Sequence, residues 1–366
     1  MSRTRVLAPA DLNRALLARQ MLLERARATP LKAIERLAGM QAQQVRPPFV
    51  GLWTRIEGFQ RDSLLRSIRR KKVVRATAMR ATVHLFSTRD YVALRGAFQP
   101  YLTSCIPPKA KAQLGGVALE DVVETGRAFY SEAPRSFKEL CGHLEKKYPS
   151  AHPRIAAVAV RLNVPKMQVP TDTEWGFPSV PEWSAAEVFL GEPVPMDDDA
   201  ELLVLKYLAA FGPATPADAQ VWSGRTGLRK VFEKLRHRLK VFQDEEGREL
   251  FDLPRAPRPS AETPAPVRFI PEFDNLILSH ADRTRIVDDA HRPALVSKNL
   301  HVAATFLVDG RVAGTWKLEK AKKSATLRMH PFAPLPPGVK NELTEEGGRL
   351  LEFVFPEAAT WKVSIG

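Results

Sequence analysis

Residues 202–254 have the sequence LLVLKYLAAFGPATPADAQVWSGRTGLRKVFEKLRHRLKVFQDEEGRELFDLP, and this stretch decides the fold. Leucines at helical spacing predict a first helix, and Thr215 followed by Pro216 gives the start signals of a second. A third, strongly basic helix is predicted over 227–237, and two strands then flank a tight turn at Glu246-Gly247. Three helices followed by a hairpin have the order of a winged helix, a relative of the helix-turn-helix, although unrelated folds also place helices beside hairpins.

The same order of predicted elements occurs twice more. Near the N-terminus, a hairpin turning near Arg80 follows helices over 11–25, 30–40 and 63–70, with an apolar helix inserted at 47–56. In residues 106–190, a strand starting at Lys166 follows helices over 120–130, 136–145 and 153–163. The three copies share the order of their predicted elements but no obvious sequence similarity. The repeat is therefore inferred from the order of the elements alone.

The last hundred residues have a different pattern. The segments RFIPEFDNLILS, AATFLVDGRVAGTWKLE, SATLRMHPF and GGRLLEFVF alternate apolar and polar residues, which predicts a small antiparallel β domain. An acidic break at 191–201 and a proline-rich linker at 254–266 separate the parts. We therefore predict a C-shaped α+β protein with three tandem winged-helix units and a C-terminal β domain, at 1–105, 106–190, 191–254 and 267–366.

The composition points to an anionic partner. The chain has 366 residues, and 55 Lys and Arg against 41 Asp and Glu give a formal net charge of +14. Such a balance favours nucleic acid or a membrane surface, although charge alone does not choose between them or exclude an incidental excess. The two cysteines, Cys105 and Cys141, form no CxxC pair, so neither a zinc ribbon nor a disulfide framework is expected. We expect no signal peptide and no transmembrane helix, because the sequence has no suitable apolar stretch.

The basic residues gather in three runs. Residues 61–80 hold eight basic side chains, 225–240 hold seven and 311–328 hold six, each with one acidic residue. Each run overlaps a predicted wing, recognition helix or β-hairpin, which are the parts of such proteins that touch duplex DNA. Any single run could be a solvated face, but three on matching elements favour DNA. Duplex is preferred over single strands because no aromatic residues alternate with the basic ones.

Four segments resemble one known family in sequence and in order. They are LNRALLARQMLLER, LAGMQAQQVRPPFVGLW, RATVHLF and FIPEFDNLILSHADRTRI, between Leu12 and Arg285. This combination is similar to the AlkZ-like winged-helix DNA glycosylases. The resemblance implies a C-shaped clamp on DNA and hydrolysis of the N-glycosidic bond of N7-alkylguanine and related lesions, including some interstrand crosslinks. It also assigns catalysis to a Gln-x-Gln motif, here Gln41-Ala42-Gln43, where a related branch carries Gln-x-Asp.

A pair of glutamines suits a lesion that is already a cation. A glutamine amide does not titrate usefully, so it cannot serve as a general base. N7-alkylguanine carries positive charge and leaves as a neutral base, which removes most of the need for acid catalysis. The remaining tasks are to hold a water near C1′ and to stabilise an oxocarbenium-like sugar, and two amide oxygens can do both.

The spacing of the pair sets a structural condition. On a continued helix, Gln41 and Gln43 would point about 200° apart, whereas in extended chain they point the same way. Pro47 and Pro48 follow closely and disfavour helix before them. We therefore expect the helix to end near 39–41 and the QAQ segment to unwind into the DNA cleft. From the residues alone a polar helix end is the simpler interpretation, and the family resemblance reverses that preference.

Further residues are assigned to DNA contact. In the first wing these are Arg75, Arg80 and His84, although a histidine in such a place is equally well a structural residue. In the β domain they are Arg311 and Lys317. The turn signal at Asp309-Gly310 marks a hairpin at 305–317 as the candidate lesion-probing element, with an ordinary edge hairpin as the alternative.

The motif LSHADR receives no chemical role. We expect His280, Asp282 and Arg283 to hold the β domain against the third winged helix.

The sequence as a whole predicts a monofunctional DNA glycosylase acting on N-alkylated purines in duplex DNA. The alternative is a non-enzymatic winged-helix DNA-binding protein or regulator. No HExxH, Walker or GxSxG motif occurs, so no metal or organic cofactor is expected. The expected partner is double-stranded DNA with alkylated bases, with no membrane and no obligate protein partner, and the expected location is cytoplasmic, at the nucleoid.

Overall fold

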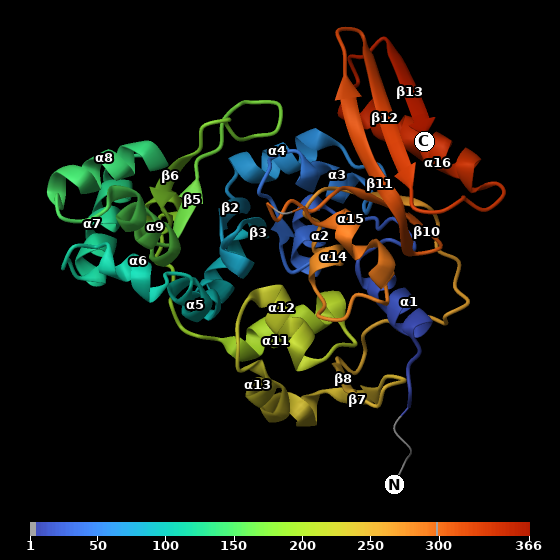
Figure 1. Ribbon diagram of the computed structural model, residues 1–366, viewed down its shortest axis with the longest axis horizontal. Coiled ribbons are helices and arrows are strands. Elements are labelled where there is room, and N and C mark those ends of the chain that lie inside the picture. The colour runs from blue at the N-terminus through green and yellow to red at the C-terminus, as the bar shows by residue number, and fades with distance from the viewer. Residues whose placement is uncertain (1–4, 298) are drawn as a thin grey trace.

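The chain alternates helices with short β-hairpins, as a computed structural model that describes residues 5–297 and 299–366 shows (Figure 1). Residues 1–4, at the start of the stretch searched for a signal peptide, lie outside this description. Within the described residues, no helix combines the length and apolarity that crossing a membrane requires. The fold is a mixture of helices and sheets.

The first part of the chain surrounds a small hairpin with helices. Its elements are α1 (Pro9–Arg19), α2 (Pro30–Arg36), β1 (Met40–Gln41), α3 (Pro47–Trp53), α4 (Arg61–Arg69), β2 (Val73–Thr77), the 3-10 turn η1 (Met79–Ala81), β3 (Val83–Ser87) and α5 (Thr88–Ser104). The predicted inserted helix and the hairpin turning near Arg80 are confirmed. The first two helices end earlier than predicted, and the long helix α5 was not predicted.

Helix α2 ends where the backbone leaves right-handed space. The Thr29 hydroxyl caps its start by accepting from the Lys32 N–H at 3.3 Å. At its end, Ala38 has φ of 52° and Gly39 has φ of 90°. A Cβ on Gly39 would lie 2.6 Å from the Phe86 ring, so only glycine fits there. The chain continues as the extended strand β1, and the predicted unwinding of the QAQ segment is confirmed.

The next two parts of the chain contain the predicted helices. The second has α6 (Pro108–Ala112), α7 (Leu119–Glu132), β4 (Arg135–Ser136), α8 (Phe137–Lys147), α9 (Pro153–Asn163), β5 (Lys166–Gln168), β6 (Glu182–Ala185) and α10 (Ala186–Leu190). The third has α11 (Ala200–Phe211), α12 (Pro216–Ser223), α13 (Leu228–Leu235), η2 (Arg236–Arg238), β7 (Lys240–Gln243) and β8 (Glu249–Asp252). The three helices and the hairpin predicted over 202–254 are thus present.

One sheet joins the first two parts. Its six strands run in the order β1-β3-β2-β5-β6-β4, so three strands from residues 1–105 are followed without a break by three strands from residues 106–190. The junction is the antiparallel pairing of Ala76 in β2 with Met167 in β5. Both residues are fully buried. The sheet therefore continues across the boundary predicted at residue 105.

The C-terminal part is a sheet with one covering helix. Its elements are β9 (Arg268–Ile270), α14 (Asn275–Leu278), η3 (Asp289–His291), α15 (Arg292–Leu295), β10 (Thr305–Val308), β11 (Arg311–Lys320), β12 (Ser324–Pro331), α16 (Val339–Val354) and β13 (Thr360–Ile365). The strand order is β13-β12-β11-β10-β9.

Two features of this part differ from the prediction. The pair β12 and β13 is parallel, so the sheet is not purely antiparallel. The segment GGRLLEFVF, predicted as a strand, lies in helix α16 and its last turn. Leu343, Leu350, Leu351 and Val354 recur at helical spacing and are fully buried against the sheet. Burial of each stabilises the helix by roughly 1.5–3 kcal/mol, which outweighs the local alternation.

Buried ion pairs fasten the parts of the chain to one another. Arg19 in α1 donates two 2.8 Å bonds to Asp252 at the end of β8, and both side chains are inaccessible to solvent. Arg55, after α3, pairs with Asp274 through bonds of 2.8 and 2.9 Å. Breaking such a pair by removing one partner costs about 3–5 kcal/mol, because an uncompensated charge stays buried. The parts next to the QAQ segment are therefore held in fixed relation.

Candidate active site

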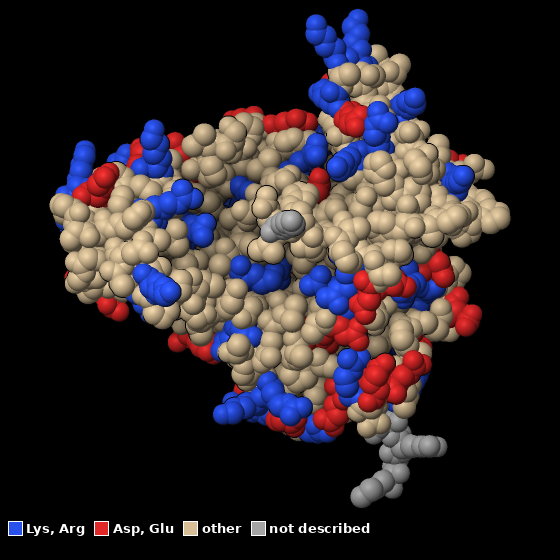
Figure 2. Space-filling view, in the orientation of Figure 1, with Lys and Arg blue, Asp and Glu red and all other residues tan. Residues whose placement is uncertain are grey.

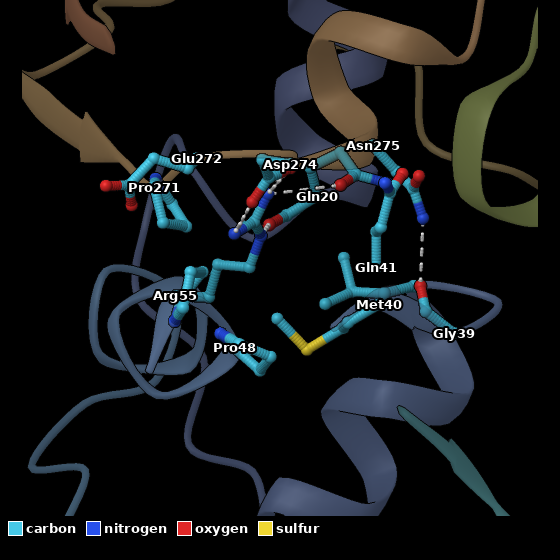
Figure 3. A pocket seen from close by; sticks show the side chains of 12 residues that line it. Gln20, Gly39, Met40, Gln41, Pro48, Arg55, Pro271, Glu272, Asp274 and Asn275 are labelled. Atoms are coloured by element: carbon cyan, nitrogen blue, oxygen red, sulfur yellow. Dashed lines mark hydrogen bonds and ion pairs between the residues drawn. The ribbon is translucent and has the colours of Figure 1, made fainter. Parts of the chain in front are cut away.

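Gln41 lies on the edge strand β1, where it pairs with His84 of β3. Its side chain is almost buried and lines a small pocket together with Arg55, Asp274 and Asn275 (Figure 3). The amide oxygen Oε1 accepts a hydrogen bond of 2.8 Å from Nη2 of Arg80. The amide is therefore anchored rather than free in solvent.

Gln43 lies two residues further along the chain, just after β1, where the backbone bends. The intervening Ala42 is buried, and its N–H donates to the Val83 carbonyl at 2.7 Å, which continues the pairing with β3. The Gln43 side chain is exposed, and its Oε1 accepts from the Val83 N–H at 3.3 Å. The Gln41 amide is thus buried against Arg80, whereas the Gln43 amide is exposed beside β3.

Arg75 supports the QAQ backbone from within the sheet. Its guanidinium donates to the Ala42 carbonyl at 2.9 and 2.6 Å, to the Gln43 carbonyl at 3.2 Å, and to the Gln168 amide oxygen. Burial lowers the pKa of Arg75 to about 10, so it remains charged at neutral pH. The side chain is only 5% exposed. The structure thus contradicts the predicted contact of Arg75 with DNA, because its guanidinium is hydrogen-bonded to oxygen atoms of the protein.

Arg80 is also turned inward. It sits at the tip of the β2–β3 hairpin with φ of 54° and ψ of 23°. Its guanidinium donates to Gln41, to the Asn275 amide oxygen at 2.8 Å and to the carbonyl of Trp222. Burial lowers the pKa of Arg80 to about 10, which keeps it cationic at neutral pH. The sequence predicted that Arg80 contacts DNA, but the structure places its guanidinium against the Gln41 and Asn275 side chains.

His84 is fully buried in β3, and the structure contradicts its predicted contact with DNA. Its Nδ1 lies 3.2 Å from the Thr82 carbonyl, and its Nε2 has no hydrogen-bond partner among the described residues. Burial, together with the nearby charge of Arg80, holds the pKa of His84 well below 6.5. The ring is therefore neutral at physiological pH and packs as a core residue.

Arg311 and Lys317 lie on β11 and are exposed, as a DNA contact would require. Arg311 donates to the Thr284 carbonyl at 2.9 Å, whereas Lys317 faces Arg328 of β12 across the sheet. The structure brings neither of them to the QAQ segment.

The turn of the predicted probing hairpin packs against helix α1. Asp309 bonds to Arg14 of α1, and Gly310 lies against Leu17 of the same helix. The β10–β11 turn is therefore held to α1, although the Asp309 side chain is exposed. The hairpin that projects from the molecule is β11–β12, whose two strands run up to a turn at 321–323 (Figure 1). The probing role of the hairpin at 305–317 stays a prediction, and the projecting β11–β12 hairpin is a second candidate for it.

Asp274 and Asn275 are the residues at this site that sequence reasoning missed. They stand at the start of helix α14, where Asp274 caps the Leu276 N–H at 2.9 Å. Asn275 accepts from Arg80 and donates to the Gly39 carbonyl at 3.4 Å. Both occur in the quoted segment FIPEFDNLILS, so the signal was present, but nothing in the sequence connects this segment to residues 39–41.

The LSHADR motif contacts the third part of the chain, as expected. His280 is buried with Nε2 at 3.1 Å from the Phe211 carbonyl, and Asp282 accepts from Arg248 at 2.8 Å. Burial and the charge of Arg285 lower the pKa of His280 to about 3. Arg283 donates to the His280 carbonyl at 3.4 Å.

Basic side chains line a hollow on one face of the molecule. Figure 2 shows them along the depression between the lobe of α7–α9 and the rest of the chain, and at the tip of the β11–β12 hairpin. Acidic side chains gather mainly on the opposite side of this view, near β7 and β8. A cationic hollow of this kind is the electrostatic footprint of a nucleic-acid-binding protein.

The comparisons with known proteins define the class of this DNA-binding protein further. A profile of the DNA glycosylase AlkZ-like family matches residues 34–353, and the chain belongs to this family. It is a DNA glycosylase, and the alternative of a non-enzymatic DNA-binding protein is set aside.

Two related proteins fit this assignment. The chain is 25% identical over 333 residues to an interstrand DNA cross-link repair glycosylase of Streptomyces sahachiroi, spanning 82% of this chain and 85% of the relative. The solved structure of the Streptomyces sahachiroi DNA glycosylase AlkZ superposes with a TM-score of 0.79 at 18% identity, covering 99% of this chain and 100% of that one. The latter similarity shows a common fold.

Proposed function

We propose that this glycosylase hydrolyses the N-glycosidic bond of N-alkylated purines of the N7-alkylguanine type in duplex DNA, with Gln41 and Gln43 as catalytic residues. The observation that carries the proposal is that the QAQ segment lies outside the helix with both of its amides anchored. Arg80 holds the Gln41 amide and the Val83 N–H holds the Gln43 amide, while Arg75 holds the backbone between them. Such anchoring is what catalysis by positioning requires, because amides cannot exchange protons usefully.

The chemistry needs little from the protein because the lesion supplies the charge. The C1′–N bond breaks, and its electron pair leaves with the cationic base, which becomes neutral. Water adds its oxygen to C1′ and releases a proton to solvent. The amides hold this water and stabilise the developing oxocarbenium ion electrostatically. The product is an intact abasic site and a free base.

The proposal includes the arrangement of the whole chain on DNA. Residues 1–105, 106–190 and 191–254 would act as three winged-helix units and residues 267–366 as a β domain, together forming a C-shaped clamp. The β11–β12 hairpin, with exposed Lys322 and Lys323 in its turn, would be a second candidate beside 305–317 for the lesion-probing element. Exposed Arg311 and Lys317 remain proposed DNA contacts.

The related Streptomyces glycosylase is described by its action on interstrand crosslinks. We extend the proposal to crosslinks that join N7-alkylated guanines, since each half of such a lesion is the same cationic leaving group. Alkylated double-stranded DNA at the nucleoid, in the cytoplasm, is thus the proposed partner and place of action.

The test is single-turnover excision from duplex DNA containing N7-methylguanine, with abasic sites revealed by alkali. Gln41→Ala and Gln43→Ala should each slow excision roughly tenfold to a few hundredfold, because each removes a positioning amide. Affinity for DNA should stay nearly unchanged, since neither side chain carries charge. The double variant should lose less than the product of both losses, because the two amides act on one water. Gln43→Asp should remain active, since aspartate orients water and stabilises a cation.

Gln44→Ala is the matched control, because Gln44 is an exposed glutamine next to the pair and should excise at the parental rate. Excision at the parental rate by both Gln41→Ala and Gln43→Ala would overturn the catalytic assignment. A protein–DNA adduct trapped by borohydride would instead indicate an amine nucleophile and contradict simple hydrolysis.

A further inference from the structure

The orientation of the Gln41 amide is fixed by the chemistry of its partner. A guanidinium group has N–H donors and no acceptor. The Gln41 atom that lies 2.8 Å from Nη2 of Arg80 must therefore be the carbonyl oxygen. The amide nitrogen Nε2 has no hydrogen-bond partner among the described residues, although it is not sealed off from solvent. The free end of Gln41 is thus a donor.

Several segments distant in sequence converge on Arg80. Gln41 comes from β1, the Trp222 carbonyl from α12 and Asn275 from α14. Asn275 is itself tied to the turn before β1 through the Gly39 carbonyl. Arg80 also adopts left-handed backbone angles, a conformation that costs a non-glycine residue energy and persists only where the surroundings enforce it. These contacts fix the Arg80 guanidinium against the Gln41 amide.

We propose that Arg80, assisted by Asn275, is a positioning residue that sets the Gln41 amide with its oxygen inward and its NH2 group free to donate. This inference rests on the proposed catalytic role of the QAQ segment. It divides the work of the pair. Gln41 donates from Nε2 to the oxygen of the shared water. Gln43, whose oxygen has only a long bond of 3.3 Å to the Val83 N–H, is the better acceptor for water.

The decisive variant is Arg80→Gly, because glycine adopts φ of 54° without strain and should preserve the hairpin. Single-turnover excision of N7-methylguanine should slow about a hundredfold, as for loss of a preorganised amide. The salt dependence of DNA binding should not change. An arginine that contacts phosphate would instead reduce the slope of log K against log salt by about 0.9. Asn275→Leu should slow excision less, because Gln41 keeps its bond to Arg80.

Arg283→Met is the matched control. Arg283 lies close enough to influence Arg80 electrostatically, and its removal deletes the same charge without touching Gln41. It should excise at the parental rate. Guanidinium ion at low, non-denaturing concentration should partly restore Arg80→Gly by filling the vacated space. It should not restore Gln41→Ala or the Arg80→Gly, Gln41→Ala double variant.

Gln41→Glu tests the polarity of the amide, because a carboxylate keeps an acceptor for Arg80 but has no N–H to donate. It should be as slow as Gln41→Ala. Near-parental excision by Gln41→Glu would overturn the donor assignment. Parental excision by Arg80→Gly, or a smaller salt slope with no slowing, would overturn the positioning role. If the parental protein excises no N7-methylguanine, the proposed function fails instead, so the two failures are distinguishable.

Discussion

Burial, more than charge, decides what the basic side chains around Gln41 do. Arg75 and Arg80 belong to a run of eight basic residues that the sequence assigns to DNA. In the structure, protein carbonyl and amide oxygens occupy both guanidinium groups. Within the same run, Lys71 and Lys72 are exposed, and Lys71 donates to the Phe189 carbonyl at 2.6 Å. The two arginines therefore build the candidate site from within the protein.

Two buried histidines make stability sensitive to acid. Burial holds the pKa of His84 well below 6.5 and that of His280 at about 3, whereas both titrate near 6.5 when unfolded. Between pH 6.5 and these lower values the unfolded chain binds more protons than the native one. The free energy of unfolding should therefore fall with falling pH, by up to about 1.4 kcal/mol per pH unit for each histidine.

Urea denaturation at several pH values between 7 and 4.5 would measure this dependence. His280→Gln keeps a donor for the Phe211 carbonyl and should flatten the slope by about one proton. Replacing the exposed His237 by glutamine is the control and should leave the slope as it is. A parental slope in His280→Gln would show that this ring is not kept neutral by burial.

Among the helices and strands, local signals were reliable where caps and turns are strong. Thr215 and Pro216 predict α12, and its capping box is present. The helix over 153–163 was found with the predicted bounds. The mistakes come from long-range packing. Alternation in GGRLLEFVF favoured a strand, but burial against the sheet selects a helix. The pairing of β2 with β5 and the meeting of Asn275 with Arg80 are tertiary contacts, which local patterns do not encode.

The candidate site was predicted in part: its QAQ segment was found, but the roles of the side chains around it were not. The QAQ motif came from the family resemblance, and its unwinding from the spacing of the two glutamines and from the prolines at 47 and 48, which restrict the backbone locally. The roles of Arg75, Arg80 and His84 could not be predicted, because a basic residue near a hairpin turn is normally exposed. Only the fold brings oxygen atoms of the QAQ segment within reach of Arg75 and Arg80, and only the fold buries His84.

The β11–β12 hairpin should contribute to DNA affinity through its turn. Replacing Lys322 and Lys323 by alanine removes two exposed charges from the projecting tip. If both contact phosphates, the slope of log K against log salt should decrease by nearly 2. Fluorescence anisotropy with a labelled duplex measures this. Lys146→Ala with Lys147→Ala on α8, at the outer end of the molecule, deletes the same charge and should have little effect (Figure 1). Equal effects of both double variants would refute a specific role for the hairpin.

The net charge of +14 and the basic hollow predict strongly salt-dependent binding by the protein as a unit. A protein that neutralises 6–10 phosphates loses roughly 10³–10⁵ in affinity between 50 and 200 mM salt. We expect a loss near the lower end for a 20-base-pair duplex, chosen here at about two helical turns. Damaged and undamaged duplexes should share one slope, because phosphate contacts do not read the lesion. A flat response across this range would exclude the hollow as the DNA channel.

The sheet shared by the first two parts of the chain also governs the order of biosynthesis. Strand β2 emerges from the ribosome long before its neighbour β5, and residues are added at roughly 5–20 per second. For several seconds the nascent chain therefore exposes β2 as an unpaired edge, which is a known route to aggregation. A gene fragment ending near residue 105 would retain that edge permanently. Heterologous expression of such a fragment should give inclusion bodies, whereas fragments that extend past β6 complete the sheet.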